Sequence, residues 1–172
     1  AEAMRAAKAR GMQVALNPAP MDGRVGTLPL ELVDVLIVNA IEGAELLKLR
    51  GAEAPEAPTA ALEALHGLFP EAQIVMTLGE NGVAAVDADG AVSQTAAFRV
   101  QAVDTTAAGD TFAGFFLASR ARGAGMAAAL RLASAAAAIG VTRPGASPSV
   151  PSIREVEAWL AARDGERTCN EH

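Results

Sequence analysis

The 172-residue sequence has few aromatic side chains: Phe, Trp and Tyr together make up 3%, and Tyr is absent. Aromatic-filled β-sandwiches and RNA-binding modules that stack bases on rings are therefore poor fits. Positive charge is also scarce, since the formal net charge is −6 and the sequence pI is about 4.9. A nucleic-acid partner would require a basic face, so we expect none.

Cysteine and long apolar runs are equally scarce. Cys169 is the sole cysteine, which excludes a disulfide framework within the chain and a cysteine metal cluster. No run approaches the length of a membrane-spanning helix, and the first residues lack the charged and apolar regions of a signal peptide. We therefore expect a cytoplasmic protein with no membrane partner.

What is abundant is apolar sequence, 51% of the residues, arranged as short strand-like runs that alternate with helical patterns. We predict helices over 1–10, 40–50, 60–69, 111–122, 126–141 and from about Ser152 to Ala162, strands over 12–16, 34–38 and 73–78, a helical turn at 29–33, and a hairpin of 83–86 with 91–95. Thr59 and Ser152 are expected to cap the helices that follow them. Such alternation predicts an α/β fold with a mainly parallel sheet, flanked by helices, in one domain over 1–162 followed by a polar tail over 163–172.

The most informative stretch lies where an apolar run meets a predicted helix, at Ala107-Ala108-Gly109-Asp110. The first N–H groups of a helix lack partners and attract anions, and small residues let a phosphate come close. Gly109 would also tolerate a strained φ. Asp110 beside that phosphate could take the proton from an attacking alcohol. The alternative is an ordinary first-turn acid after a loop glycine.

Other polar residues follow the predicted strands, and ligands of such sheets bind beyond the carboxyl ends of the strands. We expect Asn39, Glu42, Thr77, Gly79, Gly82 and Asp110 to gather at that edge. Two alternatives stay open. Asn39 with Glu42 is also the pattern of a helix cap, and Thr77 to Gly82 is also the pattern of a simple turn.

Taken together, these motifs resemble the carboxy-terminal portion of the ribokinase-like phosphofructokinase-B (PfkB) family of sugar and nucleoside kinases. The resemblance covers about residues 1–162 and rests on four segments, which are Leu16–Pro20, Thr77–Val83, Asp104–Phe112 and Val141–Pro151. It implies a ribokinase-like, Rossmann-type fold. The family's upstream Gly-Gly sugar motif and small β-sheet lid are not in this sequence, which leads us to expect that it begins within a domain.

The resemblance implies roles for individual residues. Asp110 would be the catalytic base in contact with the sugar, and Ala107, Ala108 and Gly109 would form the anion hole with its backbone N–H. ATP would be bound by Asn39, Thr77, Leu78, Gly79, Glu80, Asn81, Gly82, Gly109, Asp110 and Ser134, the last near the adenine. Glu42 would hold Mg²⁺ through water. For Ser134 a helix-packing role is the alternative.

A monovalent cation site, usually for K⁺, is also implied by the resemblance. Its residues would be Asp104, Thr106, Gly140, Arg143, Gly145 and Ser149, with oxygen ligands that suit a hard cation. The alternative is that Asp104 and Thr106 form turns and that Arg143-Pro144-Gly145 is a tight loop.

The expected activity is ATP-dependent phosphorylation of the primary hydroxyl of a sugar, D-ribose to ribose 5-phosphate first, by a parent enzyme that is a homodimer. The alternatives are a sibling kinase for another sugar or a nucleoside, and a non-catalytic nucleotide-binding fragment. Because the lid and sugar motif are not in the sequence, we expect residues 1–172 alone to be inactive.

Overall fold

The computed structural model describes residues 1–169, with side chains as far as residue 165. The chain divides into two compact units, Ala1–Gln94 and Thr95–His172.

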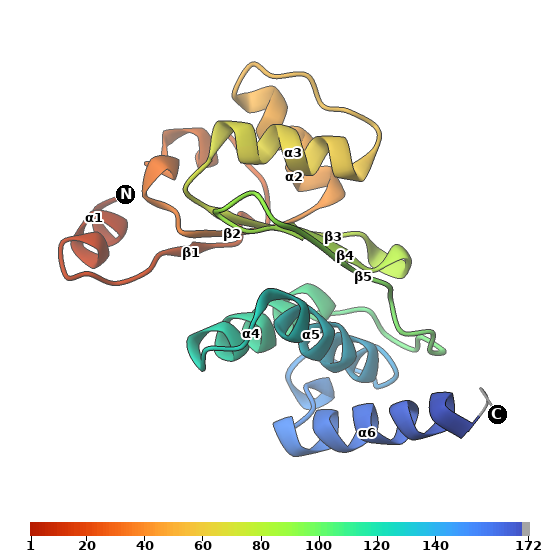
Figure 1. Cartoon of the computed structure of the whole chain (residues 1–172). Helices are drawn as coiled ribbons and strands as arrows, with labels where there is room; N and C mark the ends of the chain where they lie inside the picture. The colour runs from red at the N-terminus through yellow and green to blue at the C-terminus, as the bar shows by residue number, and fades with distance from the viewer. Residues whose placement is uncertain (170–172) are drawn as a thin grey trace. The chain divides into compact units, whose positions relative to one another are not determined.

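The first unit is built around a five-stranded sheet (Figure 1). Its elements are α1 (Glu2–Lys8), β1 (Ala15–Leu16), 3-10 turns at Val25–Thr27 and Leu30–Leu32, β2 (Val35–Asn39), α2 (Ala40–Leu49), α3 (Pro58–Leu68), β3 (Gln73–Thr77), a 3-10 turn at Gly79–Asn81, β4 (Val83–Val86) and β5 (Val92–Thr95). The strand order is β1-β2-β3-β4-β5. β1, β2 and β3 run parallel, and β4 is antiparallel to β3.

Helices α2 and α3 lie over one face of this sheet (Figure 1). Fully buried leucines of α2 and α3 share a core with strand residues, among them Leu46, Leu65, Ile74 and Met76. Gly43 allows a close approach of α2 to the sheet, because a Cβ there would lie 2.9 Å from the Met76 methyl carbon. This packing holds β2 and β3 in register, so their carboxyl ends meet at one edge.

The second unit is helical, with α4 (Ala108–Ala121), α5 (Met126–Gly140), a 3-10 turn at Ser147–Ser149 and α6 (Ile153–Cys169). α4 packs along α5, and α5 packs on α6. Alanine side chains make this possible, since Ala129, Ala133 and Ala136 are fully buried in α5. Val156 of α6 is fully buried in a small core with alanines of α5.

The mainly parallel sheet, the 83–86/91–95 hairpin and the order of the elements confirm the sequence-based prediction. The predicted strand 12–16 is wrong over its first three residues, because only Ala15 and Leu16 pair with β2. The prediction that Thr59 caps α3 is also wrong. Ala57 is the N-cap, since Pro58, with its fixed φ, begins the helix one residue before Thr59.

Helices α4 and α6 are longer than predicted. α4 begins at Ala108 instead of 111, and α6 continues past Ala162 to Cys169. Two contacts support this extension: the Arg163 guanidinium lies 3.9 Å from the centre of the Trp159 ring, and Arg131 pairs with Asp164 at 2.6 Å. Most of the predicted polar tail is therefore helical, and residues 170–172 of it lie outside the described residues.

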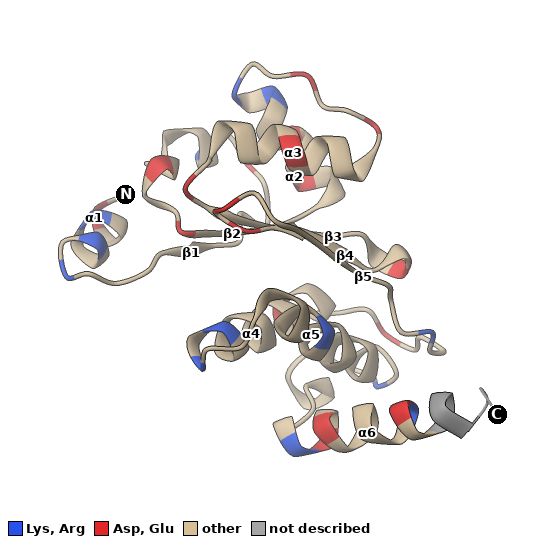
Figure 2. Cartoon of the chain, viewed as in Figure 1, with Lys and Arg blue, Asp and Glu red and all other residues tan. Residues whose placement is uncertain are grey.

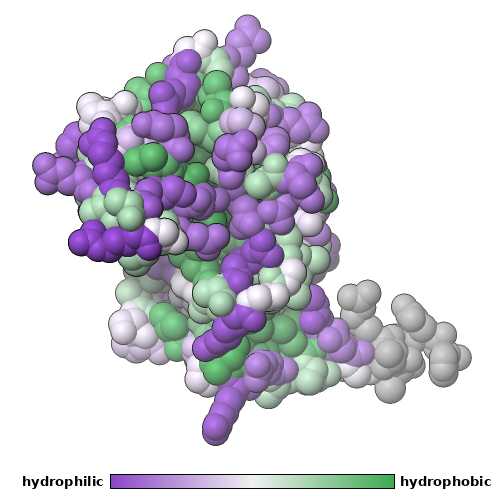
Figure 3. Space-filling model, turned by 60° about the vertical axis from the view of Figure 1, so that its left-hand side comes forward, coloured by the Kyte–Doolittle hydropathy of each residue, from purple (hydrophilic) through white to green (hydrophobic). Residues whose placement is uncertain are grey.

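The surface carries charged residues of both signs and some apolar ones. Figure 2 shows acidic and basic residues on helices of both units. Hydrophilic residues predominate on the face in Figure 3, with smaller apolar areas between them. Ile41 and Val103 are the most exposed of the large apolar residues, at 72% and 66%. Within the described part of the chain, no helix has the length and hydrophobicity that a membrane span requires.

Candidate active site

The start of α4 has an unusual backbone. Ala107, the N-cap, lies in the left-handed region with φ 60° and ψ 15°, where no other non-glycine residue of the described chain has a positive φ. No side chain caps the helix. The strained φ that Gly109 would tolerate thus falls at Ala107, and Gly109 is helical. Left-handed non-glycine residues cost free energy and are frequent at functional sites.

Two backbone N–H groups at this helix start find no acceptor in the part of the chain that the structure describes. The Ala108 N–H donates to the Thr105 carbonyl at 3.2 Å, whereas the N–H groups of Gly109 and Asp110 have no acceptor among the described residues. A Cβ added at Gly109 would meet nothing within 4 Å, so the space beside this residue is open. Two adjacent free donors at the positive end of a helix favour an anion.

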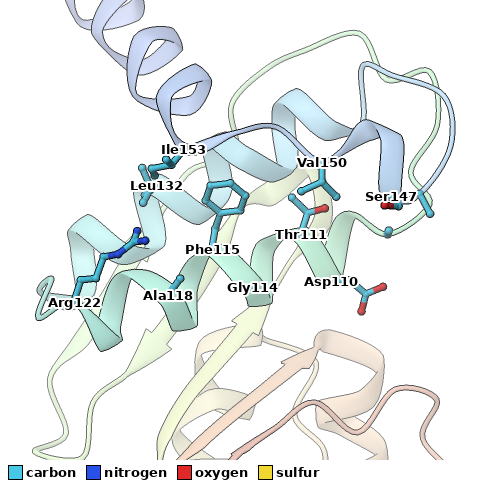
Figure 4. Close-up of a pocket in the computed structure, with 12 residues that line it drawn as sticks. Asp110, Thr111, Gly114, Phe115, Ala118, Arg122, Leu132, Ser147, Val150 and Ile153 are labelled. Atoms are coloured by element: carbon cyan, nitrogen blue, oxygen red, sulfur yellow. The ribbon is translucent and has the colours of Figure 1, made fainter.

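Asp110 is the third residue of α4 and is exposed. Its carboxylate accepts no hydrogen bond and forms no ion pair within the described residues, so it is available to a substrate hydroxyl. In Figure 4 its side chain leaves the first turn of α4 and points away from Phe115 and Leu132. The carboxylate and the free N–H groups therefore lie at the same helix end.

A cavity of about 510 Å³ runs along α4 (Figure 4). Apolar side chains such as Phe115, Leu132 and Ile153 contribute most of its lining, with Asp110 toward one end and Arg122 toward the other. Sequence reasoning missed this cavity. The available signal was the i, i+4 spacing of Asp110, Gly114, Ala118 and Arg122, which puts them on one face of the helix.

At the sheet edge, Asn39 and Glu42 form a complete capping box at the start of α2. The Glu42 N–H donates to Asn39 Oδ1 at 2.8 Å, and the Asn39 N–H donates to Glu42 Oε2 at 2.8 Å. The capping alternative is thus present in the structure. Glu42 Oε1 has no partner among the described residues, and an oxygen of this kind suits water-mediated contact with Mg²⁺.

Asn39 lies opposite Thr77 in the pairing of β2 with β3, as expected for parallel strand ends. After Thr77 the chain makes a tight turn, in which the Leu78 N–H donates to the Gly82 carbonyl at 2.8 Å. Gly79 and Gly82 have φ values of 59° and 100°, which explains why both are glycine. The first unit thus brings together Asn39, Glu42 and the loop of 77–82.

Ser134 lies in α5 of the second unit and is half-buried between two buried alanines. No hydrogen bond of its hydroxyl is found within the described residues. The expected position near an adenine stays a prediction.

The candidate cation residues are joined across a long stretch of sequence. The Asp104 carboxylate accepts from the Thr106 N–H at 2.9 Å and from the Gly145 N–H at 2.8 Å. Hydrogen bonds from Thr106 and from Gly145 lower the pKa of Asp104 to about 2, so its charge is fixed at neutral pH. The turn alternative for Asp104 and Thr106 is present, and the same carboxylate also ties the two loops together.

The donor set around these loops consists of oxygens. The carbonyl oxygens of Thr106, Arg143 and Gly145 accept no hydrogen bond among the described residues, and Ser149 is 2% exposed. The described residues contain no cluster of three or more His, Cys, Asp or Glu that could hold a metal. A hard monovalent cation therefore fits this set better than a transition metal.

Comparison with known proteins first defines the class of fold. Ribokinase from Thermotoga maritima superposes with a TM-score of 0.81 at 34% identity, covering 92% of this chain and 52% of that one. Ribokinase from Cryptococcus neoformans var. grubii, in complex with ADP, gives 0.84 at 30% identity and covers 91% and 56%. The fold is thus ribokinase-like.

Sequence comparison then defines the family. Residues 1–153 match the model of the pfkB family carbohydrate kinases, and the chain belongs to this family. Ribokinase of Haemophilus influenzae is 38% identical over 92% of this chain and 50% of its own length. Deoxyribokinase of Salmonella typhi is 33% identical over 91% and 50%. The chain spans about half the length of these curated relatives.

Proposed function

We propose that this chain provides the nucleotide-binding and phosphoryl-transfer part of an ATP-dependent sugar kinase. The observation that carries the proposal is the start of α4, where two N–H groups and the carboxylate of Asp110 lie together and have no partner among the described residues. Catalysis of phosphoryl transfer requires chiefly that the protein position the reactants and stabilise the charge on the phosphoryl group. It also requires one group that orients the attacking hydroxyl. This helix start offers both.

In this proposal Asp110 orients the primary hydroxyl of the sugar and takes its proton. The N–H groups of Gly109 and Asp110, assisted by Ala107 and Ala108, bind the oxygens of the transferring phosphoryl group. Mg²⁺, when bound, neutralises the phosphate charge. Glu42 would hold it through water, because one of its oxygens serves in the capping box, and Asn39 would lie near the nucleotide phosphates.

The ATP nucleoside would lie over the loop of Thr77–Gly82, whose positive-φ glycines let a ligand approach the backbone. Ser134 would lie near the adenine. K⁺ would bind between the loops that Asp104 joins and would support the anion hole from behind.

D-Ribose is the substrate we propose first, because ribokinases are prominent among the relatives. The deoxyribokinase relative makes a sibling kinase the second candidate. We further propose that the parent enzyme is a cytoplasmic homodimer with small-molecule substrates and no nucleic-acid partner.

The test is ribose-dependent ADP formation with Mg²⁺ and K⁺, by this chain and by a version extended to the length of its relatives. Activity in the extended version alone is the expected result. Activity with deoxyribose or a nucleoside, and not with ribose, would move the assignment to a sibling kinase. No activity with any of these acceptors would leave a non-catalytic nucleotide-binding protein.

A further inference from the structure

Helix α6 begins with half of a capping box. Its N-cap Ser152 accepts a hydrogen bond from the Glu155 N–H at 3.3 Å, as the sequence predicted. In the complete box of α2, the glutamate returns to the N-cap N–H. Glu155 does not, because its two carboxylate oxygens accept from Arg143 instead, Oε2 at 3.4 Å from Nη1 and Oε1 from Nη2. Figure 2 shows acidic residues near this end of α6.

Arg143 belongs to the loop between Gly140 and Ser149, which supplies part of the candidate cation site. This loop is fixed at its start, where the Arg143 N–H donates to the Gly140 carbonyl at 3.0 Å. It is fixed again at Gly145, whose N–H donates to Asp104. The Arg143 side chain adds a third attachment of this loop, because its guanidinium pairs with the Glu155 carboxylate.

We propose that Glu155 is a positioning residue for the monovalent cation site. By holding Arg143 through two hydrogen bonds, it sets the direction of the free carbonyl groups of Arg143 and Gly145, and thereby the affinity for K⁺. This inference rests on the cation site of the proposed function. Glu155 itself need not touch the ion.

If the Arg143–Glu155 pair contributed only to global stability, its removal would change the melting temperature with and without K⁺ alike. The side chains of Arg143 and Glu155 are 36% and 39% exposed, and exposed ion pairs contribute little to global stability. Removal of this pair should therefore change the response to K⁺ and leave the melting temperature without K⁺ almost unchanged.

The test compares Glu155→Gln with Glu157→Gln, an exposed glutamate on the same helix with no partner among the described residues. K⁺ is titrated into the full chain at constant ionic strength, with choline as the replacing cation. Melting temperature is followed together with the fluorescence of Trp159, which lies one turn along α6 from Glu155. We expect the K⁺ midpoint of Glu155→Gln to rise about three- to fivefold, and that of Glu157→Gln to equal the wild type.

Arg143→Gln removes the other partner of the same ion pair, so the test can still be made if Glu155→Gln folds poorly. It should shift the midpoint equally, and the double variant should add nothing more. A K⁺ midpoint unchanged in both single variants, beside a responsive wild type, would overturn the role of Glu155 and leave the cation site standing. A wild-type chain without any K⁺ response would overturn the cation site itself, and this inference with it.

Discussion

Ala107 is the N-cap of α4, and Asp110 lies in the first turn of this helix. Each has a feature that the fold does not require. Ala107 takes a left-handed conformation that glycine would adopt more easily. Asp110 leaves its carboxylate without a partner among the described residues. Left-handed strain at a non-glycine residue is disfavoured in a structure optimised only for stability, so the conformation of Ala107 favours a binding or catalytic role for this turn.

Replacement of Asp110 by Asn should lower turnover about 10²- to 10⁴-fold in an active version of the kinase, because the amide cannot accept the proton. Nucleotide affinity should stay largely unchanged, which isothermal titration with ATP would check. Asp89→Asn, in the hairpin turn, is the matched control. Turnover of Asp110→Asn equal to the wild type would remove Asp110 from its role as base.

Replacement of Ala107 by Gly should raise the free energy of unfolding by up to about 1 kcal/mol, since relief of the left-handed strain exceeds the added freedom of the unfolded chain. Ala107→Val should lower it by about 1–3 kcal/mol, because a β-branched side chain fits this conformation poorly. Urea denaturation of both variants measures the difference. A stabilised Val variant would contradict the left-handed conformation.

At the scale of elements, side chains fix how helices and strands begin. The capping box of Asn39 and Glu42 starts α2 directly after β2. Asp34 connects α1 and β1 to β2, because its carboxylate accepts from Lys8 Nζ at 2.6 Å and from the Val14 N–H at 2.7 Å. The capping box thus lies at the carboxyl end of β2, where Asn39 and Thr77 meet, and the contacts of Asp34 lie at its amino end.

Asn39→Ala should lower the free energy of unfolding by about 1 kcal/mol through loss of the cap. Asn39→Asp keeps an acceptor for the Glu42 N–H and should cost far less. Chemical denaturation compares the two variants. Equal losses for Ala and Asp would show that the amide group of Asn39, and not its capping oxygen, is what the structure needs.

The link made by Asp34 should depend on pH. Burial raises the pKa of Asp34, but the hydrogen bonds from Lys8 and from the Val14 N–H outweigh it, so that the pKa lies below its ordinary value of 3.8. The stabilisation is therefore fully present above about pH 4 and is lost as the pH falls through the lowered pKa.

Melting temperatures of wild type and Asp34→Asn test this dependence. The difference between them should be largest near pH 6 and should shrink below pH 4. Glu31→Gln, an exposed acid nearby in sequence, is the control. A difference that is constant from pH 6 to pH 3 would show that the charge of Asp34 contributes nothing.

At the scale of the whole molecule, the chain has two compact units. The core of the first unit contains leucines of α2 and α3 with strand residues, and that of the second contains alanines of α5 with Val156 and Leu160 of α6. The candidate nucleotide loop lies in the first unit, and the candidate anion hole and cation loops lie in the second. The candidate residues of the proposed function are thus divided between the two units.

Leu65→Ala should lower the stability of the first unit by about 2–5 kcal/mol, because Leu65 is fully buried in its core. Hydrogen exchange should accelerate most in residues 1–94. Val156→Ala is the matched variant for the second unit, and its effect should be greatest beyond residue 95. Uniform acceleration through both units, in either variant, would show that they unfold together.

Much of the fold could be predicted because its signals are local. Apolar runs, helical spacing, Gly11 and Gly51 after their helices and the Asp87–Gly90 turn all act within a few residues, and the corresponding elements are present. The helix ends were less predictable. α3 begins earlier than predicted, at Pro58. α6 ends later than predicted, and contacts of Trp159 and Asp164 stabilise its added turns.

The sequence by itself determined the order of the elements, the parallel character of the sheet and the helix start after Ala107, because short-range propensity and periodicity control these features. Only the tertiary structure decided which distant residues meet. The Asp104 carboxylate accepts a hydrogen bond from the Gly145 N–H, and Arg143 pairs with Glu155. Among the described non-glycine residues, the left-handed conformation falls at Ala107. These depend on how loops pack against helices, and contacts between residues far apart in the chain leave no periodic pattern in it.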